Sequence, residues 1–246
     1  MKPRTPALDR RTAMRLAVTE YERCAELLLS LDQQDWATPT ACPDWDVRQM
    51  AAHMLGMVEM AASIREGNRQ QRAATVDGNI DVDRMTALQV SERADWSGPA
   101  IADRFAVRYG KAARGRRLTP GLIRRRTMIG GVINGVEEPW TLGYLIDVIL
   151  TRDPWMHRLD IGTALDRAPR LTAEHDGVIV ADVVAEWADR HGKDFTLHLT
   201  GPAGGTWTVG SGGPKLELDA VGFCRVISKR PGPADFADLM STEVPY

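Results

Sequence analysis

The first half of the chain shows the hydrophobic periodicity of α-helices. In its first segment, small and apolar residues recur every three or four positions, which places them on one face of a helix. These positions are Ala13, Ala17, Tyr21, Cys24, Leu28 and Leu31. A second helix is predicted to begin after Asp46, where Gln49 completes a capping box, and to end near Gly67. Its apolar stripe is formed by Val47, Met50, Ala51, Met54, Val58, Ala61 and Ala62.

Two further helices are predicted in the middle of the chain. One begins near Asp83 and continues into an arginine-rich stretch, with a break around Gly115 or Pro120. The glycine-rich residues 127–136 predict no single element. The next helix is predicted to start near Pro139, because proline suits the first turn of a helix. Its stripe is formed by Leu142, Leu145, Ile146, Ile149 and Leu150.

The pattern changes after about residue 166, where the letters DRAPRL indicate a connection between domains. Thr172 is predicted to cap a helix that ends at Gly192, a suitable left-handed residue. Alternation and turn residues then predict three strands and a packed helix, at 195–200, 206–209, 215–219 and 220–228. The predicted fold is mainly α plus α/β, with a helical bundle over residues 1–165 and a C-terminal α/β domain over residues 166–246.

Composition narrows the class of protein. Of the 246 residues, 43% are hydrophobic, which excludes wholesale disorder, and no apolar run approaches the ~18 residues that a membrane span needs. No continuous apolar stretch follows the basic start, so no secretory signal is expected. Three cysteines without a CxxC pair argue against a disulfide framework. A reduced, cytoplasmic protein is therefore expected.

The net charge of −2 hides an uneven distribution. Residues 104–126 contain nine basic residues and no acid: Arg104, Arg108, Lys111, Arg114, Arg116, Arg117, Arg124, Arg125 and Arg126. One interpretation is a solvated helix end and loop. A second is attraction of a small anionic substrate or cofactor, with residues 124–126 drawing in a dicarboxylate. Nucleic acid is the least favoured partner, because no recognised nucleic-acid-binding fold accompanies the charge.

Two polar residues continue the apolar face of the fourth predicted helix beyond its last apolar position. Asp153 lies four residues after Ile149, and His157 lies four after Asp153, so both continue the buried face. An unpaired buried carboxylate costs several kcal/mol, which demands a partner. His53, at the margin of the second helix's stripe, is a candidate. Two imidazoles and one carboxylate from facing helices suffice to hold a divalent metal with an open position.

Simpler interpretations remain open from the residues alone. Asp153 and His157 would also suit a plain hydrogen-bonded pair, and Asp153 would suit a surface pair with Arg152 or Arg158. A lone histidine such as His53 is often a satisfied core residue.

Pro154 adds a complication to the same helix. It removes a hydrogen bond to the carbonyl of Leu150 and is expected to kink the helix. Such a kink would change the direction of the Asp153 side chain.

Two segments resemble a known family. Residues 36–56, W-x-x-P-T-x-C-P-D-W-D-V-R-x-M-A-A-H-x-x-G, resemble the N-terminal signature of the mycothiol-dependent maleylpyruvate isomerase family, part of the DinB-like metalloprotein superfamily. Residues 152–164, R-D-P-W-M-H-R-L-D-I-G-T-A, are similar to its second signature. The chain looks closest to an uncharacterised actinobacterial subgroup. The resemblance implies a DinB-like four-helix bundle, followed by a module similar to sterol-carrier-protein-type domains.

The resemblance also implies a ligand set. The family's metal ligands fall on His53, Asp153 and His157, with aspartate in place of the glutamate of the characterised isomerase. The arginine that its C-terminal domain contributes to catalysis and cofactor binding matches Arg230 best, although a basic residue after a helix also suits the helix dipole. Asp160 is a candidate to orient the imidazole of His157, or is an ordinary surface cap.

The function expected from these features is thiol chemistry at a divalent metal, with Zn²⁺ favoured and Fe(II) or Ni(II) also suited. Metal coordination makes a bound thiol a thiolate, and by resemblance that thiol is mycothiol. The expected reaction is isomerisation of a small electrophile such as maleylpyruvate, or S-transfer to it. The alternatives are a non-catalytic metal- or ligand-binding module and a regulatory protein that uses residues 104–126.

Overall fold

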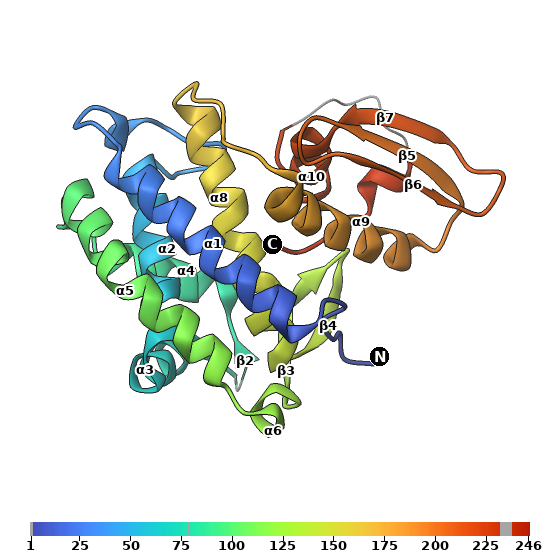
Figure 1. Ribbon diagram of the computed structural model, residues 1–246. Coiled ribbons are helices and arrows are strands. Elements are labelled where there is room, and N and C mark those ends of the chain that lie inside the picture. The colour runs from blue at the N-terminus through green and yellow to red at the C-terminus, as the bar shows by residue number, and fades with distance from the viewer. Residues whose placement is uncertain (1, 78, 232–237) are drawn as a thin grey trace. The chain divides into compact units, whose positions relative to one another are not determined.

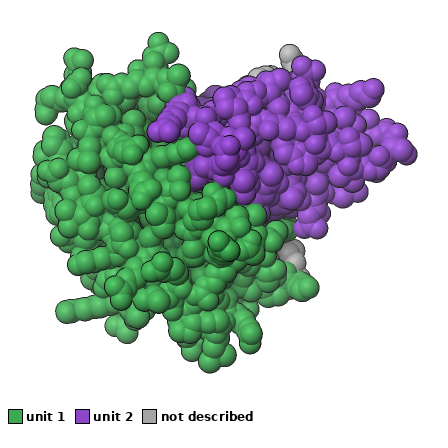
Figure 2. Space-filling model, viewed as in Figure 1, with its two compact units in different colours: residues 1–132, 136–168 green, residues 133–135, 169–246 purple. Residues whose placement is uncertain are grey.

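The computed structural model describes residues 2–77, 79–231 and 238–246 (Figure 1). They divide into two compact units, which Figure 2 colours separately. Unit 1 consists of residues 1–132 and 136–168, and unit 2 of residues 133–135 and 169–246.

Unit 1 is built on four long helices, α1, α2, α5 and α8, that pack against one another (Figure 1). The helices are α1 (Arg10–Leu29), α2 (Val47–Ala62), α3 (Ile64–Ala74), α4 (Val82–Ser91), α5 (Gly98–Leu118), α6 (Gly121–Arg124), α7 (Leu142–Tyr144) and α8 (Leu150–Ala164). The shorter elements are the 3₁₀ turn Asp35–Ala37, the π-helical turn Leu145–Ile149 and the strands β1 (Thr75–Val76), β2 (Asn79–Ile80), β3 (Thr127–Ile133) and β4 (Val136–Thr141). The predicted apolar stripes of α1 and α2 meet in one buried core, which includes Tyr21, Leu28, Met50, Met54 and Phe105.

The predicted second helix is two helices. The capping box of Asp46 and Gln49 starts α2 as predicted, but α2 ends at Ala62 rather than near Gly67. Ser63 adopts extended backbone angles, and its side chain accepts a hydrogen bond from the backbone N–H of Glu66, which starts α3. The predicted apolar stripe also stops at Ala62, so the serine cap marks the start of a separate, mostly polar helix.

The predicted third helix is also divided, into α4 and α5. Ser97 accepts a hydrogen bond from the Ala100 N–H, and a proline occupies the first turn of α5. These are two starting signals that the periodicity did not reveal. Beyond α5 the basic run continues into α6.

The predicted helix start at Pro139 is wrong, because Pro139 lies inside strand β4. Strands β3 and β4 form a two-stranded sheet joined by Asn134 and Gly135, both with positive φ. Asn-Gly is the strongest two-residue hairpin signal, so Asn134 and Gly135 indicate a β-hairpin within this glycine-rich segment. The helix begins at Leu142, where Thr141 accepts a hydrogen bond from the N–H of Tyr144.

Pro154 lies inside α8, yet the helix continues to Ala164. The carbonyl of Leu150, deprived of its usual donor by Pro154, accepts a hydrogen bond of 2.7 Å from Nη1 of Arg116 on α5. Nε of Arg116 donates to the carbonyl of Ile146 in the adjacent π-helical turn at 2.9 Å. The buried guanidinium thus satisfies two backbone carbonyls just before Asp153.

In unit 2 two helices accompany a three-stranded sheet of order β6-β5-β7. Strand β5 pairs antiparallel with β6 and parallel with β7. The elements are the π-helical turn Ala173–Gly177, α9 (Val178–His191), β5 (Phe195–Thr200), β6 (Gly205–Val209), β7 (Lys215–Asp219), α10 (Ala220–Ile227) and the 3₁₀ turn Asp238–Ser241. Trp187 packs edge-on against Phe195 and Phe223 in its core.

The sequence predictions for unit 2 hold for its three strands, its last helix and Gly192, which ends α9 in the left-handed conformation with φ of 61°. Thr172 occupies the N-cap position as predicted, but its side chain makes no capping hydrogen bond to the helix that follows it. Within the described parts of the chain, no helix has both the length and the apolar character to cross a membrane.

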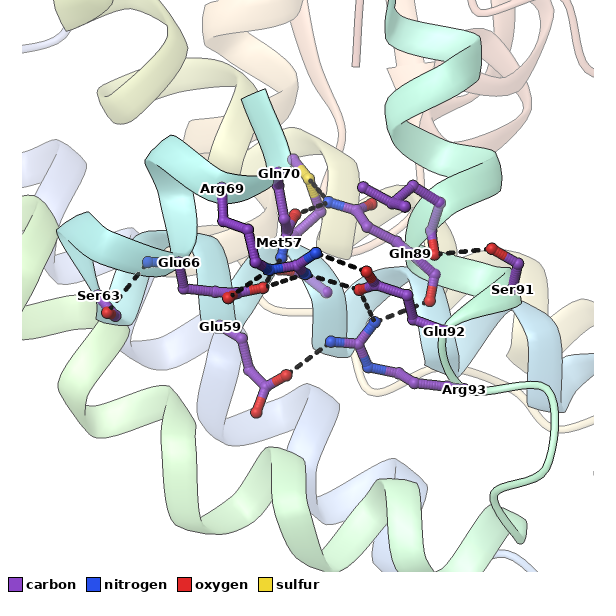
Figure 3. A network of polar contacts seen from close by, with 12 residues as sticks. Met57, Glu59, Ser63, Glu66, Arg69, Gln70, Gln89, Ser91, Glu92 and Arg93 are labelled. Atoms are coloured by element: carbon purple, nitrogen blue, oxygen red, sulfur yellow. Dashed lines mark hydrogen bonds and ion pairs between the residues drawn. The ribbon is translucent and has the colours of Figure 1, made fainter. Parts of the chain in front are cut away.

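A network of arginines and glutamates joins α3 and α4 to α2 (Figure 3). Arg69 on α3 donates to Glu66 and to Glu92, the residue that follows α4. Arg93 donates to Glu59 on α2 at 2.6 Å and to the backbone carbonyl of Gln89 at 2.8 Å. These ion pairs hold the short helices α3 and α4 against α2.

This network predicts a loss of stability in acid. The hydrogen bonds from Arg69 lower the pKa of Glu66 from 4.5 to about 2, so its contribution is present above pH 4.5 and is lost as the pH falls toward 2. The Glu66→Gln variant should have a Tm lower by roughly 1–3 °C at pH 6, because exposed pairs contribute only about 1 kcal/mol. In thermal melts the difference should shrink below pH 4.5 and be mostly lost near pH 2, where half of Glu66 is protonated in the folded state. The control is Glu26→Gln at an exposed position of α1, and equal pH profiles for the two variants would contradict the prediction.

Candidate metal centre

Three sequence-predicted ligands come together between α2 and α8. Nε2 of His53, on α2, lies 3.2 Å from Oδ1 of Asp153, on α8. Nε2 of His157, one turn further along α8, lies 3.4 Å from the same oxygen. The side chains are 6%, 13% and 9% exposed for His53, Asp153 and His157. Both imidazoles therefore converge on one carboxylate oxygen inside unit 1.

The geometry of these three side chains fits a divalent metal. Two metal–ligand bonds of about 2.1 Å at a tetrahedral angle place the ligand atoms about 3.4 Å apart. The two observed separations, 3.2 and 3.4 Å, match this spacing, and the ligand atoms of all three residues lie within 4.8 Å of one another. The second carboxylate oxygen, Oδ2 of Asp153, is buried without a hydrogen-bond partner, and coordination to a cation would compensate for this.

Each imidazole turns its other nitrogen toward an acceptor. Nδ1 of His53 lies 2.8 Å from Oε1 of Gln89 on α4. Nδ1 of His157 lies 3.5 Å from Oδ2 of Asp160, close enough for an ion pair but without the geometry of a hydrogen bond. Asp160 is fully buried, so its interpretation as a surface cap is wrong. This pattern, with one nitrogen of each histidine facing inward and the other facing an oxygen, is common in protein metal sites.

Electrostatics couple the three residues. Burial by itself would raise the pKa of Asp153, but the charges of His53 and His157 and hydrogen bonds from both rings hold it well below its ordinary value. For His157, burial works to lower the pKa, and the Asp153 carboxylate overcomes this and raises it well above 6.5. A positive charge in this cavity is therefore stabilised by the aspartate, whether a proton or a metal ion carries it.

Trp45 and Cys42, from the loop before α2, border the centre. The ring of Trp45 lies 5.3 Å from that of His53 and 6.1 Å from that of His157, measured between centroids. Sγ of Cys42 lies 4.0 Å from Oδ2 of Asp160. Together with His157 and Asp160, Cys42 forms a second set of atoms that are close enough to hold a metal. The loop thus adds an aromatic wall and a thiol beside the centre.

The surface alternative for Asp153 is wrong. Arg158 is buried and donates to both carboxylate oxygens of Glu20 on α1, at 2.6 and 3.1 Å. Arg152 is also buried, with 2% of its surface exposed. The ion-pair partners of Asp153 are the two imidazoles.

The arginine-rich segment 104–126 is only partly solvated. Arg116 and Arg124 are buried, and Nη1 of Arg124 lies 2.5 Å from Oδ2 of Asp147. Nε of Arg104 donates to Glu59 at 2.7 Å. The expectation that Arg124 attracts a dicarboxylate from solution is therefore wrong, because its charge is already neutralised by a buried aspartate.

Arg230 lies in unit 2, two residues after the C-cap of α10. Its side chain donates to Oγ of Ser228 at 3.1 Å, and its backbone N–H donates to the carbonyl of Arg225 at 2.9 Å. The proposed metal ligands all belong to unit 1, so a catalytic role for Arg230 stays a prediction.

Sequence reasoning missed two polar residues near the centre, Gln89 on α4 and Gln70 on α3. Both are completely buried. A signal was present for Gln89, which lies four residues after the buried Met85 and so interrupts an apolar face as Asp153 does on α8.

Comparison with known proteins supports the fold. The family described as "Mycothiol maleylpyruvate isomerase N-terminal domain" matches residues 17–162. A crystal structure of the mycothiol-dependent maleylpyruvate isomerase aligns with a TM-score of 0.59 at 14% identity, covering 97% of this chain and 95% of the other. A histidine-to-alanine mutant of that enzyme aligns with a TM-score of 0.55 at 12% identity, covering 89% and 88%. No curated protein matches the sequence. At this identity the two structures establish a shared fold.

Proposed function

The chain belongs to the mycothiol maleylpyruvate isomerase N-terminal domain family, and on that premise we propose that it is a metal- and mycothiol-dependent enzyme acting on a small electrophile. The observation that carries the proposal is the convergence of two imidazole nitrogens on one buried carboxylate oxygen. His53, Asp153 and His157 would hold the metal, for which we propose Zn²⁺. Three ligands leave a coordination position for a thiol.

The metal supplies one chemical property: a thiol that coordinates Zn²⁺ loses its proton at neutral pH. Residues of the chain supply the rest. Asp153 balances the charge, Asp160 orients the imidazole of His157, and the ring of Trp45 limits the access of water. Addition of the mycothiol thiolate to a conjugated double bond, rotation and re-expulsion of the thiolate would isomerise the substrate. If the enolate formed by addition were instead protonated at carbon, by water or by the thiol proton, the product would be a thioether, the outcome of S-transfer.

The proposal extends to the two parts of the chain. Residues 1–165 would form a DinB-like four-helix bundle that carries the metal, and residues 166–246 a module of the sterol-carrier-protein type. In this module Arg230 would bind an anionic group of mycothiol or of the substrate. A reduced thiol cosubstrate is consistent with a cytoplasmic protein.

The test is metal content together with thiol consumption. Protein purified without a histidine tag should contain one equivalent of Zn²⁺ by elemental analysis and should isomerise maleylpyruvate only when mycothiol is present. The His53→Ala variant should lose both properties. The His198→Ala variant, which removes an exposed imidazole on β5, should keep both.

The competing function is a binding module without turnover. Stoichiometric metal without isomerisation or thiol consumption, across a panel of electrophiles, would favour that module. In a regulatory role for residues 104–126, the buried Arg116 and Arg124 would take no part, because both are held in contacts of unit 1.

A further inference from the structure

Two buried glutamines form a chain of hydrogen bonds that ends on His53. Oε1 of Gln89 lies 2.8 Å from Nδ1 of His53, and Nε2 of Gln89 donates to Oε1 of Gln70 at 2.8 Å. Nε2 of Gln70 donates to the backbone carbonyl of Gly56 at 3.2 Å and to Oε1 of Glu66 at 2.9 Å. Figure 3 shows the amide of Gln89 directed toward Gln70, with Glu66 held by Arg69 beyond it.

The far end of this chain fixes its direction. A backbone carbonyl and a carboxylate only accept hydrogen bonds, so the Gln70 group that faces Gly56 and Glu66 must be the NH₂. The carbonyl oxygen of Gln70 then faces Gln89 and must receive a donor, the NH₂ of Gln89. The carbonyl oxygen of Gln89 is left for His53, so Nδ1 of His53 must carry a proton.

We propose that Gln89 and Gln70 are positioning residues that keep a proton on Nδ1 of His53 and leave Nε2 as its only metal-binding nitrogen. The orientation is set by Glu66, whose carboxylate is paired with Arg69. The inference rests on the proposed function, because it assumes that His53 binds a metal. It assigns α3 and α4, which carry none of the three proposed ligands, a role in the centre.

Gly56 provides the space for this relay. A Cβ atom at position 56 would lie 2.5 Å from Cγ and 2.6 Å from Cβ of Gln89, closer than real contacts allow. The glycine lies three residues after His53 on α2, in the H-x-x-G part of the sequence motif. Any larger side chain would displace the amide that holds the imidazole.

The first test measures the histidine directly. In metal-free protein labelled with ¹⁵N, Nδ1 of His53 should give the signal of a protonated ring nitrogen. In Gln89→Leu this preference should be lost, because leucine offers no acceptor. The Gln89→Glu variant loses the donor to Gln70 but keeps an acceptor for Nδ1–H, so its Nδ1 should stay protonated as in the wild type.

The second test measures Zn²⁺ affinity by competition with a chelator. Gln89→Leu and Gly56→Ala should each bind Zn²⁺ about 10–100-fold more weakly, the usual effect of losing a partner of a metal-binding histidine. Gln89→Glu, which keeps the acceptor for His53 but not the donor to Gln70, should bind Zn²⁺ more tightly than Gln89→Leu. The Met85→Ala variant removes a buried apolar side chain from the same helix, so it should lower Tm without changing the Zn²⁺ affinity of the folded protein.

The outcomes separate the relay from the metal proposal. An unchanged His53 signal and unchanged Zn²⁺ affinity in Gln89→Leu would overturn the relay. So would equal losses of affinity in Met85→Ala and Gln89→Leu, which would indicate a merely structural role. Wild-type protein that binds no Zn²⁺ would overturn the proposed function, while the ¹⁵N signals of the metal-free protein would still decide whether Gln89 fixes the proton.

Discussion

Replacing Asp153 with asparagine should weaken Zn²⁺ binding by roughly a hundredfold to a thousandfold. Structural zinc sites with four ligands bind with about 10–16 kcal/mol, so one ligand corresponds to on the order of 3 kcal/mol. Asparagine is a weaker ligand, and it leaves the two imidazoles without a negative charge between them. Competition with a chelator, followed by calorimetry, measures the Zn²⁺ affinity of the wild type and of Asp153→Asn.

Thermal unfolding gives an independent measure of the same effect. For wild-type protein, Zn²⁺ at a thousandfold excess over Kd adds about 4 kcal/mol of stability, which raises Tm by roughly 8–16 °C for a chain of this length. Addition of a chelator should reverse that increase. At the same Zn²⁺ concentration, the Asp153→Asn variant should gain only about 0.4–1.4 kcal/mol, so its Tm should rise by no more than about 6 °C.

The control for Asp153→Asn is the same chemical change at Asp83, an exposed position in the first turn of α4. Asp83→Asn should bind Zn²⁺ as the wild type does. A wild-type response to Zn²⁺ in Asp153→Asn would show that the metal, if bound, lies elsewhere in the protein.

Replacing Arg116 with methionine should destabilise the protein by about 3–5 kcal/mol, because it leaves the carbonyls of Ile146 and Leu150 buried without donors. The variant also removes hydrogen bonds to Tyr21 and Thr151. Tm should fall by roughly 10 °C or more. Chemical denaturation of the metal-free protein measures the change without interference from Zn²⁺.

The effect of Arg116 should reach the metal centre. Leu150 and Ile146 belong to the turns just before Asp153, so loss of their donors should make the position of the Asp153 side chain less fixed. The Zn²⁺ affinity of the protein that remains folded should therefore fall. Arg117→Met changes the exposed neighbour on the same helix and should leave stability and affinity close to wild type. Equal effects of the two substitutions would contradict the role of Arg116 in supporting α8.

The parts of the fold that the sequence predicted are those that depend on local signals. The stripe of α1 and the alternation in β5 are repeated patterns that need no distant partner. The proximity of Asp153 and His157 to His53 was also predictable, because polar residues at helical spacing on an apolar face are costly unless they are paired. The same reasoning did not give the break at Ser63, where the side chain of one residue caps a new helix.

What remained beyond the sequence depends on contacts between distant segments. A basic run does not show which of its arginines are buried, so the sequence does not separate Arg116 from its exposed neighbours. The role of Arg116 depends on the packing of α5 against α8. There its side chain donates to the carbonyl of Leu150, which lacks a backbone donor because of Pro154. The role of Gln89 likewise depends on its hydrogen bonds with His53 and Gln70, which lie on two other helices.

The division of the chain into units has a consequence for biosynthesis. All three proposed ligands, and the side chains that contact their outer nitrogens, lie between His53 and Asp160 in unit 1. Because translation proceeds from the N-terminus and domains generally fold as units, these residues leave the ribosome before most of unit 2 has been made. Cation uptake by the nascent polypeptide would therefore not have to wait for residues 169–246.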